Sequence, residues 1–448
     1  MFDTRRRKVI FIVLFLLVFS TAAFMYGKKC FKKPGFSNIY EESNGKICND
    51  FCVFYTASKN IFSNQNIYTE TMTVTGRQYI YPPIFALICA PFAALGVQAA
   101  LLIWYIGSMT ALLVSAYLST LIVLGEKPDF RKAFFIGAAA VVLTGRAFDS
   151  DFQNGQINTL ILLLVVVALY CVIRNLDTPA GLIMALAVCI KMTPVIFLPY
   201  FLYKRMWKTS LWFVIGLIIF LVIIPSVLLG LSRNFSLLGE FSNKMISPFI
   251  SIEEPPELYE EAGQSLRAAT FRFLTKTDAA SRAIDEVYVN VADLSRSTAW
   301  IIYIVAAFAI LSFTLFSLRC DGQDRTNYRL SLEFTAVILL MLLLSPVSRK
   351  AHHVVLLLPY AAIAAYTLRK KVSIRVEKES KTPYCLAVTA IIFMFLTHIL
   401  TGREIVGREL CIYFLSVSCF FWGTLFLWLS VVLILLSEVK IPNIKGKK

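Results

Sequence analysis

Long apolar runs alternate along this chain with short polar segments that are often basic. Several of these runs reach the roughly 18 residues that a helix needs to cross the hydrocarbon core of a bilayer. The longest lie at 9–26, 97–124, 211–231, 300–318 and 411–436. Because only helices and closed barrels satisfy their backbone groups inside lipid, the pattern predicts an all-α polytopic membrane protein.

One pair of apolar stretches, 180–190 and 195–203, is too short for this pattern. At about 1.5 Å per residue, each stretch reaches only roughly 15–20 Å. Both outer flanks are basic, so we predict a helical hairpin that enters the membrane from the cytoplasm, turns inside it and leaves again. Such a turn must be sheltered by protein or line a wet cavity. Lys191 would lie at its apex.

A second pair, 332–344 and 354–368, flanks the segment from Ser345 to His353 and ends at the basic cluster 369–371. It predicts a second hairpin with a second apex. That apex carries four basic or titratable residues: Arg349, Lys350, His352 and His353. The alternative is a plain charged loop on the outer face, but two adjacent histidines favour a cavity.

Two further short segments leave the number of crossings open. The stretch 84–95 follows Tyr81-Pro82-Pro83, and 133–144 is too short to cross unaided before the polar patch 145–158 begins. We therefore expect about 10 to 13 membrane segments, including short broken helices.

Charge supports a membrane protein over a nucleic-acid-binding one. Hydrophobic residues make up 58% of the 448 residues and charged residues only 16%, against about 25% in soluble domains. The net charge of +16 comes from clusters between apolar runs, which the positive-inside rule places on the cytoplasmic face. These clusters are 5–8, 204–208, 369–371 and 445–448.

This orientation predicts a multi-pass protein of the plasma membrane with both termini in the cytoplasm. We expect a single integral membrane domain over 1–448, with exoplasmic loops at 27–79 and 232–298 and a last part at 369–448 made of helices and a basic tail. Phe51, Phe54 and Tyr55 in the first loop predict an amphipathic helix lying on the membrane surface.

Three of the ten cysteines, Cys30, Cys48 and Cys52, share the first loop. On an oxidising face Cys30 can pair with either of the others, and one thiol is then left over. No ligand spacing with enough partners predicts a metal site, and we expect neither a metal nor a cofactor.

Asp50 is the acid that we single out for chemistry. It begins a polar-to-aromatic stretch, so it can cap the following helix. A carboxylate at the mouth of a membrane bundle is also costly to desolvate and is typical of a functional group. The two roles are compatible.

Asp50 and the cations of the two apices are predicted on the same, outer face. A carboxylate facing cations suits transfer of a group from a phosphate-linked donor, because the acid takes the proton of an acceptor hydroxyl and the cations stabilise the leaving phosphate. Lipid-linked sugars fit such a site.

The polar patch offers further candidates, Arg146, Gln156 and Asn158. Gln156 and Asn158 either brace the following helix or touch substrate. Asp149 and Asp151 either bind a cation or the sugar, or merely solvate the turn.

Six short motifs in order resemble glycosyltransferase family 87, the GT-C-type polyprenol-phosphate-mannose-dependent mannosyltransferases. The resemblance covers about Asp50 to Pro359. Its motifs are Asp50-Phe51 with Tyr55 and Ala57, Tyr81-Pro82-Pro83 with Ala90-Pro91, Gly155-Gln156-x-Asn158, Ala180-Gly181 with Ile190-Lys191-x-x-Pro194, Gln264-Ser265-Leu266, and Ser345-Pro346 with His352-His353.

The resemblance implies a GT-C-like bundle with an exoplasmic active site, a polyprenyl-phosphate sugar donor and a lipid or glycan acceptor. It also implies inversion at the anomeric carbon, with Asp50 as general base. The residues that we expect around the donor phosphate and sugar are Lys191, His352, His353, Arg349, Lys350, Arg146, Gln156, Asn158, Gln264 and Tyr81. Arg349 and Lys350 replace an aromatic residue common in the family, and Gly263 replaces an Asn, so the sugar and acceptor stay open.

Two other functions share these features. Broken helices with intramembrane charges are also typical of transporters and flippases, and a ligase or polymerase would take an oligosaccharide diphosphate. Against the transporter, the motif pattern has no internal repeat and both long polar loops are predicted on one face.

Overall fold

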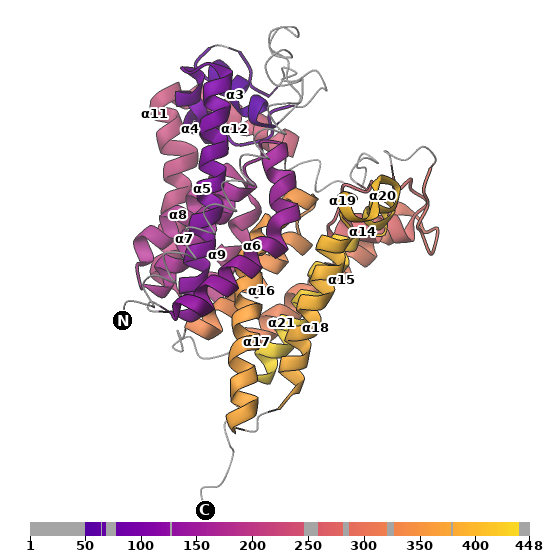
Figure 1. The fold of residues 1–448 in the computed structure, drawn as a ribbon. Coiled ribbons are helices and arrows are strands. Elements are labelled where there is room, and N and C mark those ends of the chain that lie inside the picture. Colours follow the sequence, from indigo (N-terminus) through magenta and orange to yellow (C-terminus); the bar gives the residue numbers. More distant parts are fainter. Residues whose placement is uncertain are drawn as a thin grey trace, which may run out of the picture.

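The computed structural model describes residues 50–63, 65–68, 78–125, 128–245, 259–280, 286–319, 327–377 and 380–438. Regular structure in these ranges is helical (Figure 1), and seven of their helices are long and apolar enough to cross a membrane. The predicted all-α polytopic fold is confirmed. The first apolar run, 9–26, lies outside the described residues.

The seven spans are α5 (Val97–Leu124), α6 (Phe130–Gln153), α10 to α11 (Trp207–Leu229), α15 (Arg296–Ser317), η4 with the first part of α17 (Lys350–Lys371), α18 with η5 (Thr382–Leu400) and α21 (Cys419–Ser437). Four shorter apolar helices accompany them: α4 (Pro83–Ala93), α7 (Asn158–Ile173), α8 (Asp177–Ile190) and η1 with α9 (Thr193–Tyr203).

Two groups of helices are joined through a central pair, α16 (Asn327–Leu343) and α17 (Leu357–Glu377). In Figure 1 the N-terminal helices α3 to α11 stand together, and α15, α18 and α21 lean away from them. Helix α17 contacts α5 and α6 on one side and α18 on the other, while α16 contacts α5 and α21. The second hairpin is therefore shared by both groups.

The first hairpin has the predicted form. Helix α8 ends at Ile190, Lys191 is extended (φ −147°, ψ 123°), and the 3₁₀ turn η1 (Thr193–Ile196) leads into α9 (Phe197–Tyr203). Pro194 stands in the first turn of η1, where its missing N–H costs no hydrogen bond. Lys191 is therefore at the apex, as expected.

The second hairpin differs from the prediction in length. Its returning arm begins as the 3₁₀ helix η4 (Lys350–Leu356) and continues through Arg369 to Glu377 as α17, so this arm is a full-length span. Lysine and arginine are good helix formers, and a basic cluster therefore does not end a helix.

The expectation that 133–144 ends before a polar patch is wrong. Helix α6 begins after Asp129, whose side chain accepts a hydrogen bond from the Lys132 backbone (3.1 Å), and runs on to Gln153. At about 36 Å it can cross a bilayer. Arg146 and Asp151 stay helical because their polar groups are paired inside the protein.

The run 411–436 is also not one helix. Its first part is the short helix α20 (Arg408–Ser416), and α21 begins only at Cys419. Ser418 between them is left-handed (φ 61°), a conformation that non-glycine residues adopt at the breaks of helices.

The first-loop helix α3 (Asp50–Asn60) does not lie on the membrane surface as predicted. Phe51 and Phe54 are each only 1% exposed and pack on α4 and α5, with ring centroids of Phe51 and Trp104 5.3 Å apart and those of Phe54 and Phe85 5.0 Å apart. An aromatic face fits a protein surface as well as a lipid surface, so the sequence pattern alone does not distinguish the two.

Of the second loop, the structure describes α12 (Leu231–Met245) and α14 (Leu266–Leu274). Helix α12 lies beside α3 at one end of the molecule, and α17 extends toward the other end (Figure 1). Phe235 of α12 is 53% exposed, as expected for an amphipathic helix at an interface.

Helix α8 packs closely on α10 (Trp207–Ile218) because both carry small residues at the contact. A Cβ atom on Gly181 would lie 2.5 Å from the Thr209 backbone oxygen and 2.6 Å from the Phe213 backbone nitrogen. Helices in membranes approach in this way where glycine and alanine face one another. The contact fixes the position of the first hairpin and therefore of Lys191.

We predict that Gly181→Ala destabilises the protein by about 1–3 kcal/mol, because the added methyl group meets rigid backbone atoms. Gly107→Ala is the matched control, since Gly107 is also helical, on α5, and a Cβ there meets nothing within 4 Å. That change should be neutral or stabilising by up to about 1 kcal/mol. Thermal unfolding of the purified variants in detergent measures the difference, and equal melting temperatures would contradict the close contact.

Candidate active site

The site is built on the turn between α6 and α7. Gly155 in this turn has a left-handed backbone (φ 59°), which glycine adopts without the steric cost of a Cβ. The Gln156 N–H donates to the Asp151 backbone oxygen (2.9 Å), which closes the turn. The Asp50 N–H donates to the Asn154 oxygen (3.0 Å), so the start of α3 is attached to this turn.

Asp151 at the end of α6 caps α7. Its buried carboxylate accepts four hydrogen bonds, from the backbone N–H (3.2 Å) and side-chain amide (2.8 Å) of Asn158 and from the backbone N–H (3.1 Å) and hydroxyl (2.5 Å) of Thr159. The first N–H groups of a helix have no hydrogen-bond acceptors within the helix, and the Asp151 carboxylate is the acceptor for two of them in α7. Of the roles left open for Asp149 and Asp151, Asp151 is a structural cap, and Asp149 accepts from Gln153 (2.5 Å).

Asp50 and Lys191 are connected by a chain of side-chain hydrogen bonds. Gln156 Nε2 donates to Asp50 Oδ2 (2.6 Å), and Asn158 Nδ2 donates to Gln156 Oε1 (2.6 Å). The chain ends where Lys191 Nζ donates to Asn158 Oδ1 (2.5 Å). The carboxylate of the first loop and the ammonium of the first hairpin therefore belong to one network.

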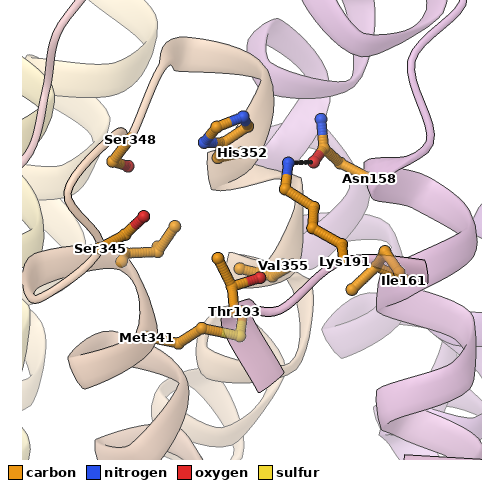
Figure 2. A pocket seen from close by; sticks show the side chains of 10 residues that line it. Asn158, Ile161, Lys191, Thr193, Met341, Ser345, Ser348, His352 and Val355 are labelled. Carbon is orange, nitrogen blue, oxygen red and sulfur yellow. Dashed lines mark hydrogen bonds between the residues drawn. The ribbon is translucent and has the colours of Figure 1, made fainter. Parts of the chain in front are cut away.

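A small cavity lies between the two hairpin apices (Figure 2). Lys191 from the first apex and His352 from the second both line it, which brings together two groups predicted from sequence. The other lining residues are Asn158, Ile161, Thr193, Met341, Leu342, Ser345, Ser348 and Val355. Its volume is about 10 Å³, room for about one water molecule, so a larger ligand enters only if the lining side chains move.

The cavity has a polar and an apolar part. In Figure 2 the Lys191 amine, Asn158 and His352 lie at one level, and Met341, Val355 and Ile161 lie below them. The lining is therefore polar at one level and apolar at the next.

His352 can donate a hydrogen bond into this space. Its Nδ1 accepts from the Arg349 backbone N–H (3.2 Å), so in the neutral ring the proton is on Nε2. Arg349 itself is exposed at the start of η4, and its charge acts on both Lys191 and His352. Lys350 is the first residue of η4 and does not line the cavity.

His353 faces away from the cavity, so the expectation that both histidines share it holds only for His352. The His353 ring is buried, donates from Nδ1 to the Arg349 backbone oxygen (3.1 Å) and packs against His398 and Phe420, with centroids 5.4 and 5.0 Å away. Successive residues of a 3₁₀ helix point about 120° apart, which separates the pair.

Gln264 and Arg146 are also placed away from the cavity. Gln264 is 2% exposed, donates from Nε2 to the Glu261 and Leu415 oxygens (2.8 Å each) and accepts from the Phe420 N–H (3.1 Å). Arg146 donates to the His398 oxygen (3.3 Å) and to the side chains of Thr401 and Cys411. Both residues join helices of the C-terminal group.

Tyr81 likewise belongs to the aromatic cluster around α3, with its ring centroid 5.0 Å from that of Phe54 and 5.2 Å from that of Phe85. Sequence reasoning missed Thr193, Ser345 and Ser348, which line the cavity. The sequence pointed to these three residues only through their position in the two predicted apices.

Two other expectations concern cysteines and metals. Cys52 is buried in α3. Cys30 and Cys48 lie outside the described residues, so their predicted pairing stays a prediction. Among the residues that the structure describes, no group of three or more His, Cys, Asp or Glu side chains is arranged to hold a metal ion.

Fold and site together define a polytopic membrane protein in which an acid of the first loop and a cation at the apex of a helical hairpin belong to one hydrogen-bond network. The family model for glycosyltransferase family 87 matches residues 79–346, more than half of the chain. This chain belongs to glycosyltransferase family 87, and the resemblance inferred from its motifs is confirmed.

This chain is similar to proteins from three bacteria. A polyprenol-phosphate-mannose-dependent alpha-(1-2)-phosphatidylinositol mannoside mannosyltransferase of Mycolicibacterium smegmatis is 27% identical over 66% of this chain and 63% of its own length. The protein of the same description from Mycobacterium tuberculosis is 33% identical over 30% of this chain and 33% of its own. An alpha-(1->3)-arabinofuranosyltransferase of Corynebacterium glutamicum is 25% identical over 44% of this chain and 48% of its own. The chain thus spans less than two thirds of each relative.

Among solved structures, ArnT from Cupriavidus metallidurans aligns in its apo state with a TM-score of 0.42 and 12% identity, over 95% of this chain and 77% of that one. The form bound to undecaprenyl phosphate aligns with a TM-score of 0.40 and 13% identity, over 94% and 76%.

The position of Gln264 leads to a prediction. Gln264→Ala leaves buried partners of its amide unpaired, which should cost about 1–3 kcal/mol of stability. Because Gln264 does not line the cavity, the folded variant should bind a ligand of the cavity with wild-type affinity. Thermal unfolding and a binding titration on the same preparation test both parts; weakened binding at unchanged stability would place Gln264 in the ligand site instead.

Proposed function

We propose that this protein transfers a mannosyl group from a polyprenyl-phosphate donor to a hydroxyl of a lipid or glycan acceptor, on the exoplasmic side of the membrane. The observation that carries the proposal is the connected pair of Asp50 and Lys191 beside a cavity with a polar and an apolar part. Family membership and the descriptions of the mycobacterial relatives support it.

The donor phosphate is held at the cavity by Lys191 and His352. An ammonium has three donors, so Lys191 can bind a phosphate oxygen while it keeps its bond to Asn158. His352 adds a donor from the facing apex, and the hydroxyls of Ser345 and Thr193 line the same space. For the donor to enter, the lining side chains must move apart, and the apolar part of the lining then faces the first isoprene units of the tail.

Asp50 acts as the general base. The acceptor oxygen attacks the anomeric carbon, its proton passes to the Asp50 carboxylate, and the bond from that carbon to the phosphate oxygen breaks. The electron pair leaves with polyprenyl phosphate, whose charge Lys191 stabilises. One displacement inverts the anomeric centre and needs one base, whereas hydrolases use a carboxylate pair.

Mannose is favoured over arabinofuranose as the donor sugar. The relative whose description names mannose aligns over 310 residues, and the arabinofuranosyltransferase over 203. The decisive experiment supplies purified protein in vesicles with polyprenyl-phosphate mannose or polyprenyl-phosphate arabinofuranose and an acceptor. Acceptor-dependent release of free polyprenyl phosphate from the mannose donor supports the proposal; transbilayer movement of intact donor without cleavage would show a flippase.

The roles of Asp50 and Lys191 predict different kinetic defects. Asp50→Asn removes the base and keeps the size, so turnover should fall by about 10²–10⁴ at nearly unchanged donor affinity. Lys191→Ala should weaken donor binding and turnover together, because a phosphate-holding cation acts in both ground and transition states.

Asp149→Asn is the matched control, because Asp149 bonds Gln153 on its own helix and does not join the network to Lys191. It should keep wild-type turnover. Donor titrations with initial rates separate the variants, and a wild-type rate for Asp50→Asn would contradict its role as the base.

Orientation gives a further prediction. Phe62 after α3 is 58% exposed, and Lys208 in α10 is exposed in the basic cluster 204–208. In a background without Cys30, Cys48, Cys320 and the exposed Cys385, a cysteine at position 62 should react with an impermeant maleimide in intact cells, and a cysteine at position 208 only after permeabilisation. The opposite result would place the site on the cytoplasmic side.

A further inference from the structure

The side chains between Asp50 and Lys191 have one possible hydrogen-bond direction. An ammonium only donates and an ionised carboxylate only accepts. With Lys191 donating to Asn158 Oδ1, the Asn158 amide group must face Gln156 Oε1, and the Gln156 amide group must then face Asp50. We call Gln156 and Asn158 the amide relay.

Asp151 fixes this direction a second time. Its Oδ1 accepts from Asn158 Nδ2 (2.8 Å), so a reversed Asn158 would place its carbonyl oxygen against a carboxylate. Asp151 and Asn158 are 1% and 3% exposed and belong to the cap of α7. The relay therefore starts from a rigid part of the fold and not from a loop.

The relay also connects three segments that are distant in sequence. Asp50 comes from the first loop, Gln156 and Asn158 from the α6–α7 turn, and Lys191 from the first hairpin. Each is positioned by other contacts as well, and the two amides join their side chains in one chain of hydrogen bonds.

We propose that Gln156 and Asn158 are positioning residues that hold the carboxylate of Asp50 in register with the phosphate-binding ammonium of Lys191. This inference rests on the proposed function. The relay acts on the reaction through Asp50 and Lys191, the two groups that it joins. The relay sets the distance between Asp50, which accepts the proton, and Lys191, which holds the leaving phosphate. An in-line displacement requires this distance to stay constant.

Two substitutions of Gln156 test the relay. Gln156→Ala removes the donor to Asp50, and turnover should fall roughly 10- to 100-fold at unchanged donor affinity, because a small misplacement of a reacting group has an effect of this size. Gln156→Glu keeps the shape but sets a second carboxylate 2.6 Å from Asp50. The two cannot both be ionised there, so they share one proton, which the new carboxyl group donates to Asp50 as the Gln156 amide does. Loss of the first proton from the pair already leaves Asp50 ionised, and sharing lowers the pKa of that step, so the acid limb of the pH–rate profile should move down by about 1 pH unit or more.

Gln153→Glu is the matched control. Gln153 lies three residues earlier, at the end of α6, and donates a hydrogen bond to Asp149, which is outside the relay. The turnover and acid limb of this variant should match the wild type. The charged and titratable groups near the relay are Asp50, Asp151, Lys191, Arg349 and His352. They are unchanged in both variants, so a moved limb reports on position 156. A purely structural role of Gln156 would lower the yield of folded protein and leave the limb in place.

The outcomes separate the relay from the proposed function. Loss of turnover in Asp50→Asn together with the moved limb in Gln156→Glu supports the relay. If Asp50→Asn is inactive but the acid limb of Gln156→Glu lies at the wild-type pH, the relay is overturned and Asp50 keeps its role as the base. The same follows if Gln156→Ala loses donor affinity as much as turnover. If Asp50→Asn transfers mannose at the wild-type rate, Asp50 is not the base and the relay is overturned, while mannosyl transfer stands. If the wild-type protein releases no polyprenyl phosphate from the mannose donor, the proposed function itself fails.

Discussion

Four hydrogen bonds into one buried carboxylate hold the centre of this protein together. Asp151 ends α6 and caps α7, so the turn between the two helices cannot open without leaving a charge unpaired in the interior. Leaving a buried charge without partners is among the costliest changes in a protein. The position of Gln156 and Asn158, and through them of Asp50 and Lys191, follows from this cap.

The two hairpins are positioned by different means. The first is held by the close contact of α8 with α10 at Gly181, where a side chain on α8 would meet the backbone of α10. The second is held by polar joints to the C-terminal helices: the Gln264 N–H donates to the Ser348 oxygen (2.6 Å), and His353 packs on His398 and Phe420. With His353 anchored on that side, His352 is directed to the cavity. Residues that never touch a ligand thus decide which of two adjacent histidines does.

The first-loop helix shows how burial changes the role of an acidic residue. The aromatic residues of α3 are buried against α4 and α5, and the Asp50 N–H is attached to the α6–α7 turn. A helix floating on the membrane would leave its first carboxylate in water at variable distance from the cations. Docked into the protein, α3 instead presents Asp50 to a fixed amide donor.

The sequence by itself determined the fold class, the first half-length hairpin with Lys191 at its apex, and the family. These follow from local properties, since hydrophobic length selects membrane helices and a Lys-x-x-Pro break inside an apolar run forces a turn. The boundaries of α6 and α17 were not determined in this way, because polar residues continue a helix wherever tertiary partners pair them. Tertiary structure alone decided that His352 and not His353 lines the cavity, that Arg146 and Gln264 join helices, and that Asp151 is a cap. Each of these depends on which distant segment lies opposite a side chain, and neither periodicity nor composition carries that information.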